Sequence, residues 1–318
     1  MNKKNICIIG VGQIGSRHLQ ALKAVKTSLD IWAVDNSKGS LKIAKERYES
    51  MNTSGGAHVL HYQNQLPKNY VFDVAIIATA SRPRAALIKE LLKKNRVKYL
   101  ILEKILFPKK SNYTEVGKLL AKHKIKTWVN CPMRMMPFYA GLKDKFGGKK
   151  ITYILHGNQS GMATDLIHHI DFVSFLTSSV DFEENPRLLD KKLKDSKRKG
   201  YVEITGSLYA SFKNGSQLLV RCDNDGRSPK IIEIFDEEKR YTILENKEKA
   251  LISKAPDWKL EEINFNLPHQ SQLTTTLIEE LLSKGKSTLP TYKESVKLHL
   301  QTFEPIRKYF GLKYYPFT

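Results

Sequence analysis

The sequence predicts an α/β protein of two domains: a doubly wound parallel sheet first, then an α+β domain with an open, mainly antiparallel sheet. The chain has 318 residues, whereas one domain usually contains about 100–200. Up to about residue 130, short apolar runs alternate with amphipathic helical patterns, as in right-handed βαβ units. Further along, period-two alternation and turn residues replace that pattern. We therefore expect domains at residues 1–129 and 130–318.

The first domain is expected to contain six strands and the helices between them. Each expected strand is a short apolar run typical of a buried parallel strand, and each helix carries apolar residues at helical spacing. Ser37 is suited to cap the second helix, whose inner stripe is Leu41, Ala44 and Tyr48. The expected strands are Lys4–Ile9, Leu29–Val34, His58–His61, Val74–Thr79, Tyr99–Leu102 and Lys126–Val129. The other expected helices are Gln13–Lys26, Ala85–Leu92 and Glu115–His123.

The second domain is expected to be built from hairpins. Tyr201–Phe212 alternates apolar and polar residues, and Asn214-Gly215 supplies a tight turn into Gln217–Cys222. Lys230–Phe235 and Tyr241–Leu244 form a second hairpin. Such a sheet has one face to cover, and three helical segments are available for it: Asp165–Leu176, Leu273–Leu282 and Tyr292–Lys308.

Composition excludes several classes of protein. Hydrophobic residues make up 41% and charged residues 27%, which is close to the average for soluble domains. The apolar stretches have the length of strands, whereas a membrane span needs about 18 residues. The start of the chain lacks the features of a secretory signal, so we expect a cytoplasmic protein with no membrane partner. Three scattered cysteines form no metal-ligand spacing and are expected as reduced thiols, with no metal site.

The net charge of +21 raises the question of a nucleic-acid partner. The densest run, residues 187–200, holds seven basic and two acidic residues, with no aromatic residue to stack on bases. We therefore expect a solvated surface and no nucleic-acid partner. Attraction of a phosphorylated small substrate is the alternative.

A glycine-rich motif lies between the first strand and the first helix: Gly10-Val11-Gly12-Gln13-Ile14-Gly15. Gly10 permits the tight turn, Gly12 lets a pyrophosphate approach, and Gly15 lets helix and strand pack closely. Asp35 follows Gly15 by twenty residues, where a carboxylate binds the adenine-ribose hydroxyls and repels a 2′-phosphate. The motif therefore predicts NAD, while the neighbouring Ser37 and Lys38 leave room for NADP. The alternative is a glycine turn that serves packing alone.

Together the motifs resemble those of the Gfo/Idh/MocA family of sugar and inositol dehydrogenases. Five motifs occur in the family's order: Gly10–Gly15, Ser16–His18, Ala78-Thr79, Glu103-Lys104 and Asp165–Asp171. The resemblance implies a nicotinamide-dependent dehydrogenase whose second domain holds a sugar substrate and forms a homo-oligomer, a dimer or tetramer, through its sheet. It also implies cofactor contacts at Gly10, Gly12, Gln13, Ile14, Gly15, Asp35, Ala78, Thr79, Glu103 and Lys104.

Lys104 is the first catalytic candidate. Glu103-Lys104 is similar to the family's Glu-Lys-Pro motif, with Ile105 where proline is usual. A lysine at the carboxyl end of a strand beside the nicotinamide can hydrogen-bond the hydroxyl being oxidised. Its pKa must fall from about 10.4 for it to act as a base near neutrality, and burial lowers the pKa of lysine. The alternative is one exposed lysine among many.

The second catalytic candidate is Asp165-Leu-Ile-His168-His169-Ile-Asp171. On a helix, Asp165 shares a face with both histidines, and His168 shares one with Asp171. A carboxylate beside an imidazole fixes its tautomer and tunes it for proton transfer. The segment resembles the family variant found in relatives from surface-polysaccharide and nonulosonate clusters, which aligns His168 as catalytic in preference to His169. The alternative is a pair of histidines in a packed domain junction.

Arg134 and the short segment before Asp165 bear on the substrate. Arg134 lies in a segment resembling the family's Asn-x-Arg-Phe-x-Pro, and it is expected either to grip a substrate carboxylate or phosphate or to form a structural salt bridge. Only residues 158–164 separate the strand Ile151–His156 from Asp165. Much of the usual substrate-covering loop is thus absent. This predicts an open pocket for a larger substrate, such as a nucleotide-linked or acidic sugar, or a pocket that a partner subunit completes.

The predicted reaction is hydride transfer between the nicotinamide and a sugar hydroxyl. Lys104 and His168, the latter oriented by Asp165, exchange the hydroxyl proton. The competing hypothesis is a protein that keeps the dinucleotide site and has lost catalysis, such as a redox sensor or an assembly subunit.

Overall fold

The chain divides into two compact units, which we call the first and the second unit. The computed structural model describes residues 3–53, 55–158, 161–223 and 225–317. The first unit contains Met1–Asn130 and Pro268–Lys293, and the second contains Cys131–Leu267 and Glu294–Thr318.

The first unit contains a six-stranded parallel sheet in the order β3-β2-β1-β4-β5-β6. Its central strands are buried on both faces, which is why they are nearly continuous apolar runs rather than alternating ones. The strands are β1 (Lys4–Ile9), β2 (Leu29–Val34), β3 (Val59–Gln63), β4 (Val71–Ile77), β5 (Arg96–Leu102) and β6 (Lys126–Val129). The predicted parallel, doubly wound sheet is confirmed.

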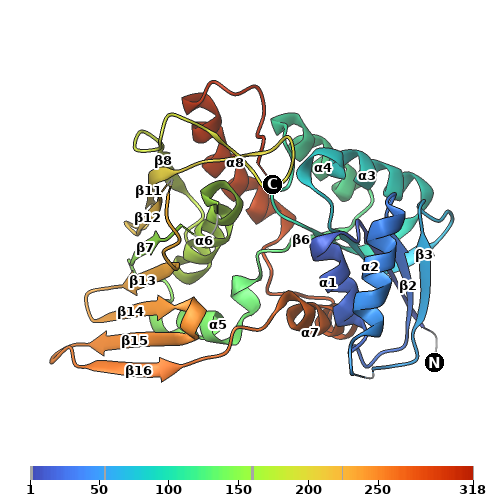
Figure 1. The fold of residues 1–318 in the computed structure, drawn as a ribbon, viewed down its shortest axis with the longest axis horizontal. Helices are drawn as coiled ribbons and strands as arrows, with labels where there is room; N and C mark the ends of the chain where they lie inside the picture. The colour runs from blue at the N-terminus through green and yellow to red at the C-terminus, as the bar shows by residue number, and fades with distance from the viewer. Residues whose placement is uncertain (1–2, 54, 159–160, 224, 318) are drawn as a thin grey trace. The chain divides into compact units, whose positions relative to one another are not determined.

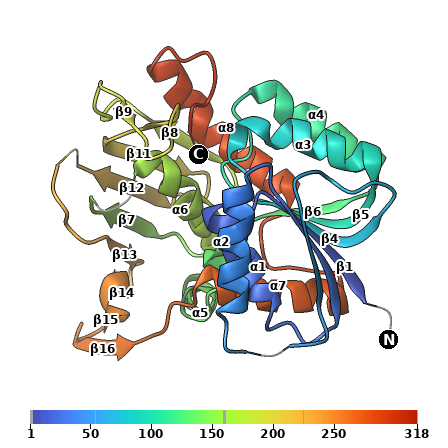
Figure 2. The ribbon, with the colours of Figure 1, turned by 45° about the vertical axis from the view of Figure 1, so that its right-hand side comes forward.

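Helices cover both faces of this sheet, because the strand order reverses direction between β1 and β4. Helices α1 and α2 pack together on one face, and α3 and α4 pack together on the other (Figure 2). The Ser37 side chain accepts a hydrogen bond from the Ser40 amide at 3.2 Å, as expected of an N-cap. The helices are α1 (Gln13–Leu22), α2 (Lys38–Glu49), α3 (Ser81–Lys94) and α4 (Lys110–Lys122).

A fifth helix of the first unit, α7 (Gln270–Lys284), comes from the C-terminal part of the sequence. It packs on α1, where Thr275 donates a hydrogen bond to the carbonyl of Ala21 at 2.8 Å. Because of these contacts, residues 268–293 lie in the first unit. The prediction that the helix at Leu273–Leu282 covers the second sheet was therefore wrong, and the predicted domain at 130–318 is interrupted there.

The second unit contains an eight-stranded sheet in the order β16-β15-β14-β13-β7-β12-β11-β8. Only β7 and β12 pair in parallel, so the sheet is mainly antiparallel, which confirms the predicted class. The strands are β7 (Thr152–His156), β8 (Phe182–Asn185), β11 (Gly206–Phe212), β12 (Gln217–Cys222), β13 (Ile231–Phe235), β14 (Lys239–Leu244), β15 (Lys249–Lys254) and β16 (Leu260–Asn264).

The long strand predicted at Tyr201–Phe212 is broken. Its first part, β10 (Val202–Glu203), pairs with β9 (Lys194–Asp195) in a separate two-stranded sheet, and only β11 joins the large sheet. Gly206 marks the break with a φ of +102°, and a Cβ there would lie 2.5 Å from the Asp190 amide nitrogen. The predicted alternation matches the observed burial from Gly206 to Phe212 but not before it, where Tyr201 and Thr205 are also buried, and it did not reveal this bend.

Helices α6 (Met162–Thr177) and α8 (Tyr292–Tyr309) accompany the large sheet. Of the 16 residues of α6, 12 are buried, and the helix runs beside β7 and β12 (Figure 1). In α8, the Gln301 amide bonds the backbone of Val180 and Phe182 at 3.0 and 3.1 Å, which ties the helix to β8. The remaining helices are η1 (Pro132–Met135), α5 (Pro137–Phe146) and η2 (Glu245–Lys247). No helix in the described ranges is long and apolar enough to cross a membrane.

Glu184 in β8 provides a test of this core. Both of its carboxyl oxygens are buried and lack a hydrogen-bond partner among the described residues, and burial raises the pKa of the group well above 4.5. Above pH 4.5 the unfolded chain therefore releases a proton that the folded chain keeps, and the free energy of unfolding falls as pH rises. Since each unit of pKa shift corresponds to about 1.4 kcal/mol, Glu184→Gln should stabilise the protein at pH 8 by about 1 kcal/mol or more.

Urea unfolding at pH 4 and pH 8 measures this effect. The matched control is Glu183→Gln, the exposed neighbour on the same strand, which should leave the free energy of unfolding unchanged. An equal response of the two variants would show that Glu184 is not held in its protonated form.

Candidate functional site

The glycine-rich turn after β1 has the shape that a dinucleotide requires. Gly10 has a φ of +86°, and a Cβ there would lie 2.6 Å from the Thr79 methyl carbon. A Cβ on Gly15 would lie 1.8 Å from the Gly10 carbonyl oxygen, so both glycines are needed for close packing. By contrast, a Cβ on Gly12 would meet nothing within 4 Å. The turn is therefore closed on the protein side and open where a pyrophosphate is expected.

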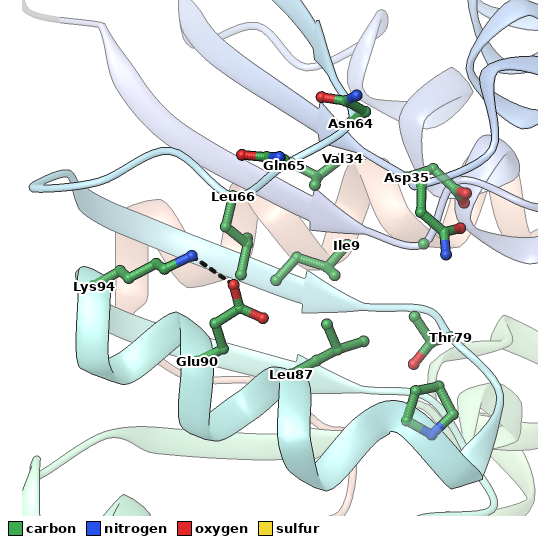
Figure 3. Close-up of a pocket in the computed structure, with 13 residues that line it drawn as sticks. Ile9, Val34, Asp35, Asn64, Gln65, Leu66, Thr79, Leu87, Glu90 and Lys94 are labelled. Atoms are coloured by element: carbon green, nitrogen blue, oxygen red, sulfur yellow. Dashed lines mark hydrogen bonds and ion pairs between the residues drawn. The ribbon is translucent and has the colours of Figure 1, made fainter.

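A pocket of about 560 Å³ lies at this edge of the sheet. Figure 3 shows the side chains of Ile9, Leu66 and Leu87 converging on it, while Asp35 and Thr79 lie toward one end. Apolar walls with a few polar groups are typical of small-molecule sites, and the walls suit an adenine ring. Other lining residues are Gly10, Val34, Asn36, Asn64, Gln65, Pro83, Glu90 and Lys94. The observed residues thus fit an NAD-type dinucleotide.

Asp35 lines this pocket at the carboxyl end of β2, as predicted. Its two carboxylate oxygens accept hydrogen bonds from the amides of Val11 and Ser37 at 2.9 and 2.8 Å. The carboxylate is therefore held beside the glycine turn. Of the other predicted cofactor residues, Gln13 accepts a hydrogen bond from Arg47 at 3.0 Å, and Ile14 is 39% exposed at the start of α1.

Glu103, at the end of β5, has a buried carboxylate that is occupied by protein groups. Its Oε1 lies 3.0 Å from Nε2 of His18 and accepts from the Asn130 amide at 2.5 Å. Since a carboxylate only accepts, Nε2 of His18 donates this hydrogen bond, and Nδ1 lies 2.8 Å from the Thr274 hydroxyl. Burial alone would raise the pKa of Glu103, but these hydrogen bonds and the charge of His18 outweigh it and lower the pKa. Glu103 thus supports the strand end rather than presenting a carboxylate to a cofactor.

Lys104 follows Glu103 and is half-buried. Ile77 of β4 pairs with Leu102 of β5, so Ala78-Thr79 and Glu103-Lys104 leave the sheet side by side. The peptide bond between Lys104 and Ile105 is cis, although isoleucine stands in the place of proline. The structure therefore brings Lys104 to the same sheet edge as Thr79, which lines the pocket.

In the second unit, Asp165 on α6 bonds His169. Nε2 of His169 lies 3.3 Å from the carboxylate, and Nδ1 lies 2.6 Å from the hydroxyl of Tyr153 on β7. His169 is only 1% exposed, so both of its ring nitrogens are used within the protein. His168 is half-buried, and its charge contributes to lowering the pKa of Asp165. The sequence favoured His168 as the histidine oriented by Asp165, whereas the defined hydrogen bond belongs to His169.

Two further charged residues join this cluster, and sequence reasoning missed them both. Nζ of Lys230, just before β13, lies 3.2 Å from the Asp165 carboxylate and 2.8 Å from that of Glu245. Glu245 in turn accepts a hydrogen bond from Tyr139 at 2.5 Å. Lys230 stands 65 residues from Asp165 in the sequence, so no local pattern could indicate the pair.

The pKa values follow from these contacts. For Asp165, burial would raise the pKa, but the hydrogen bond and charge of His169 and the charge of Lys230 hold it well below its ordinary value. For Lys230, burial would lower the pKa, but Asp165 and Glu245 raise it. Asp165 therefore stays ionised and Lys230 stays protonated near neutral pH.

Arg134 is engaged in a buried ion pair. Its Nε and Nη2 donate to the two oxygens of Asp171 at 2.8 and 2.7 Å, and the side chain is 8% exposed. Burial raises the pKa of Asp171 to about 6, although the guanidinium opposes this. Of the two alternatives for Arg134, the geometry matches the structural salt bridge. The guanidinium nitrogens expected to bind a substrate anion already bond Asp171.

One small cavity lies beside the Asp165 cluster in the second unit. This cavity of about 10 Å³ is lined by Asp165, Lys230 and Cys222 among others, which is room for about one water molecule. The predicted open pocket depends on residues 158–164, of which 159 and 160 lie outside the described residues. Within the described ranges, no group of three or more His, Cys, Asp or Glu side chains is arranged to hold a metal.

A doubly wound parallel sheet with this glycine turn and pocket defines an NAD-binding domain of the Rossmann class. Residues 4–131 match the family model described as oxidoreductase family, NAD-binding Rossmann fold (GFO_IDH_MocA). This match covers the first domain, and it confirms the resemblance to the Gfo/Idh/MocA oxidoreductases seen in the sequence. No curated protein sequence matches the chain.

Solved structures share the fold over nearly the whole chain. UDP-N-acetylglucosamine 3-dehydrogenase of Acidithiobacillus ferrooxidans is 13% identical, with a TM-score of 0.67 over 96% of this chain and 97% of that one. Biliverdin reductase of Synechocystis, solved with biliverdin and NADP+, is 13% identical, with a TM-score of 0.70 over 96% and 99%. A super-repressor mutant of Gal80p from Saccharomyces cerevisiae is 13% identical, with a TM-score of 0.68 over 98% and 96%. At these identities the likeness establishes the fold and leaves the substrate undecided.

Asp35 provides a test of cofactor preference. Asp35→Ser removes the carboxylate that accepts hydrogen bonds from the Val11 and Ser37 amides and that is expected to repel a 2′-phosphate. We expect NADH to bind about tenfold more weakly, because a hydrogen bond to a charged group contributes about 1.5–3 kcal/mol, while NADPH loses less or gains. Calorimetric titration with both cofactors measures the ratio. Glu46→Gln, an exposed charge change on α2, is the control, and an unchanged ratio in Asp35→Ser would contradict the assignment.

Lys230 provides a test of the cluster in the second unit. Lys230→Met leaves two carboxylates without their cation and should lower the free energy of unfolding at pH 7 by about 2 kcal/mol, since the pair is largely buried. The deficit should shrink as pH falls below 3.8, where the Asp165 carboxyl becomes protonated first in the unfolded chain and then in the folded one. The control is Lys249→Met, which breaks the exposed pair with Glu262 and should cost less than about 0.5 kcal/mol. Equal effects in urea unfolding would refute the special role of Lys230.

Proposed function

We propose that the protein is an NAD(P)-dependent oxidoreductase that transfers a hydride between the nicotinamide and a hydroxyl or keto group of a sugar or sugar derivative. The observation that carries this proposal is the half-buried Lys104 at the sheet edge where the dinucleotide pocket lies. The family assignment supports the oxidoreductase class. The sugar rests on the resemblance in the motifs and on the likeness to a nucleotide-sugar dehydrogenase.

The residues of the first unit suit the two halves of the cofactor. The amides of the glycine turn and the N-terminus of α1 would bind the pyrophosphate, and Asp35 would bind the adenosine ribose. Asp35 follows β2, on one side of β1, so the other half of the dinucleotide would extend toward β4 and β5, where Thr79 and Lys104 stand. When bound, the cofactor supplies or accepts the hydride at its nicotinamide ring.

Lys104 would carry the proton that accompanies the hydride. In oxidation, neutral Nζ accepts the hydroxyl proton as the C–H bond gives up its hydride and the carbonyl forms. In reduction, the ammonium returns that proton to the developing alkoxide. A positioned general acid or base of this kind contributes about 10²–10⁴ in rate.

The second unit would supply a further acid–base group. Asp165, about one-fifth exposed and held ionised, can accept a hydrogen bond from a substrate hydroxyl. His169, with both ring nitrogens bonded, acts as a positioning residue for Asp165. His168, the more accessible imidazole, remains our candidate for proton transfer. Lys230 keeps Asp165 ionised.

The proposal also includes a homo-oligomer in the cytoplasm, formed through the uncovered face of the large sheet. Half-buried apolar residues alternate there with the buried ones, among them Ile154, Leu219 and Leu251. Light scattering after size-exclusion chromatography measures the mass, and a monomer at micromolar concentration would remove the oligomer from the proposal.

The second candidate is a dinucleotide-binding regulator without catalysis. The likeness to Gal80p, solved as a super-repressor mutant, favours it. Purified protein with NAD+ or NADP+ and a panel of free, acidic and UDP-linked sugars separates the candidates through NADH or NADPH absorbance. Turnover on any panel member supports the enzyme, and tight cofactor binding without turnover supports the regulator.

Lys104→Ala tests the catalytic assignment once a sugar is accepted. We expect kcat to fall at least a hundredfold, because the proton then lacks its acceptor. The control is Lys98→Ala, an exposed lysine on the same strand, which should keep full activity. A retained wild-type rate in Lys104→Ala would exclude the residue from the mechanism.

A further inference from the structure

Arg84 on α3 is a fully buried cation in the first unit. Its exposure is 0%, whereas Arg82, two residues earlier on the same helix, is exposed. A guanidinium stays charged at any physiological pH, and burying it is expensive unless its N–H groups are bonded. The free-energy cost of burying the Arg84 guanidinium must therefore be offset by its hydrogen bonds.

Those contacts are backbone carbonyls of two separate turns. Nη1 donates to the carbonyl of Ile105 and to that of Leu106 at 3.0 Å, and Nη2 donates to the carbonyl of Thr79. Thr79 follows β4 and lines the dinucleotide pocket, while Ile105 and Leu106 follow Lys104. One side chain thus bonds the turn that carries Thr79 and the turn that carries Lys104.

The arginine fork suits this task in a way that lysine cannot match. Beyond Ile77 and Leu102 the two strands no longer pair, so their following carbonyls need other donors. The planar guanidinium presents donors on two nitrogens and reaches carbonyls on both turns together, whereas an ammonium places all its donors on one atom.

We propose that Arg84 is a positioning residue that fixes Thr79 and Lys104 relative to each other, and thereby prepares the nicotinamide half of the dinucleotide site. The inference rests on the proposed function, since it uses the assignment of Thr79 and Lys104 to that half. The adenosine half depends on other contacts, namely the hydrogen bonds of Asp35 to Val11 and Ser37. Loss of the fork should therefore affect one half of the cofactor site and spare the other.

The experiment compares NADH with AMP, which carries the adenosine half alone. Calorimetric titration of Arg84→Lys and Arg84→Met should show NADH binding weakened about tenfold, as for the loss of a charge-assisted hydrogen bond. AMP binding should stay within about twofold of wild type. Arg82→Met is the control on the same helix and should change neither affinity.

Several outcomes would overturn the inference: unchanged NADH binding in Arg84→Lys, an equal loss for NADH and AMP, or failure of Arg84→Lys to fold in a thermal melt. Failure to fold would mean that Arg84 serves the fold as a whole. No sugar is needed, so the result is independent of whether a substrate is found. If a sugar is accepted, Arg84→Lys should also lower kcat about tenfold or more with KM nearly unchanged, as expected for a misplaced Lys104.

Discussion

Where parallel strands end, the backbone groups that follow no longer pair with the neighbouring strand. In the first unit, buried side chains provide hydrogen bonds at these strand ends. Beyond Leu102 of β5, His18 and Asn130 bond the Glu103 carboxylate, and Arg84 bonds the carbonyls that follow Lys104. A buried polar group without a partner costs about 1–3 kcal/mol, so these side chains are fixed in place by their neighbours. Lys104 follows directly after this hydrogen-bonded strand end, so its backbone position depends on these contacts.

The second unit places its charges differently. Asp165, Lys230 and Glu245 are each about one-fifth to one-quarter exposed, whereas the histidine and the tyrosines behind them are almost completely buried. One side of the cluster is therefore buried and hydrogen-bonded, and the other side, which carries the charges, is partly exposed to solvent. The two carboxylates of Asp165 and Glu245 and the one ammonium of Lys230 sum to one formal negative charge, which suits hydrogen bonding to hydroxyl groups better than binding of an anion.

Features set by neighbouring residues could be predicted, and those set by distant ones could not. The glycine turn, the Ser37 cap and the helical spacing of Asp165 and His169 are local, so the sequence indicated them directly. Lys230 joins Asp165 from another strand, and Arg84 reaches carbonyls more than twenty residues away. The hydrogen bond of His169 to Tyr153 likewise involves a residue of β7, which no helical pattern includes. The place of α7 in the first unit likewise depends on its contacts with α1, which is distant from it in the sequence.

Because α7 belongs to the first unit, this unit is encoded by two separate stretches of the gene. The chain passes from one unit to the other three times, after Asn130, Leu267 and Lys293. A fragment that stopped at residue 130 would lack Thr274 and Gln270, and with them the outer partners of His18 and Asn130. Recombination that exchanged a nucleotide-binding half between relatives would therefore have to move two separate stretches of coding sequence, and tags or fusions intended to isolate that half should span both.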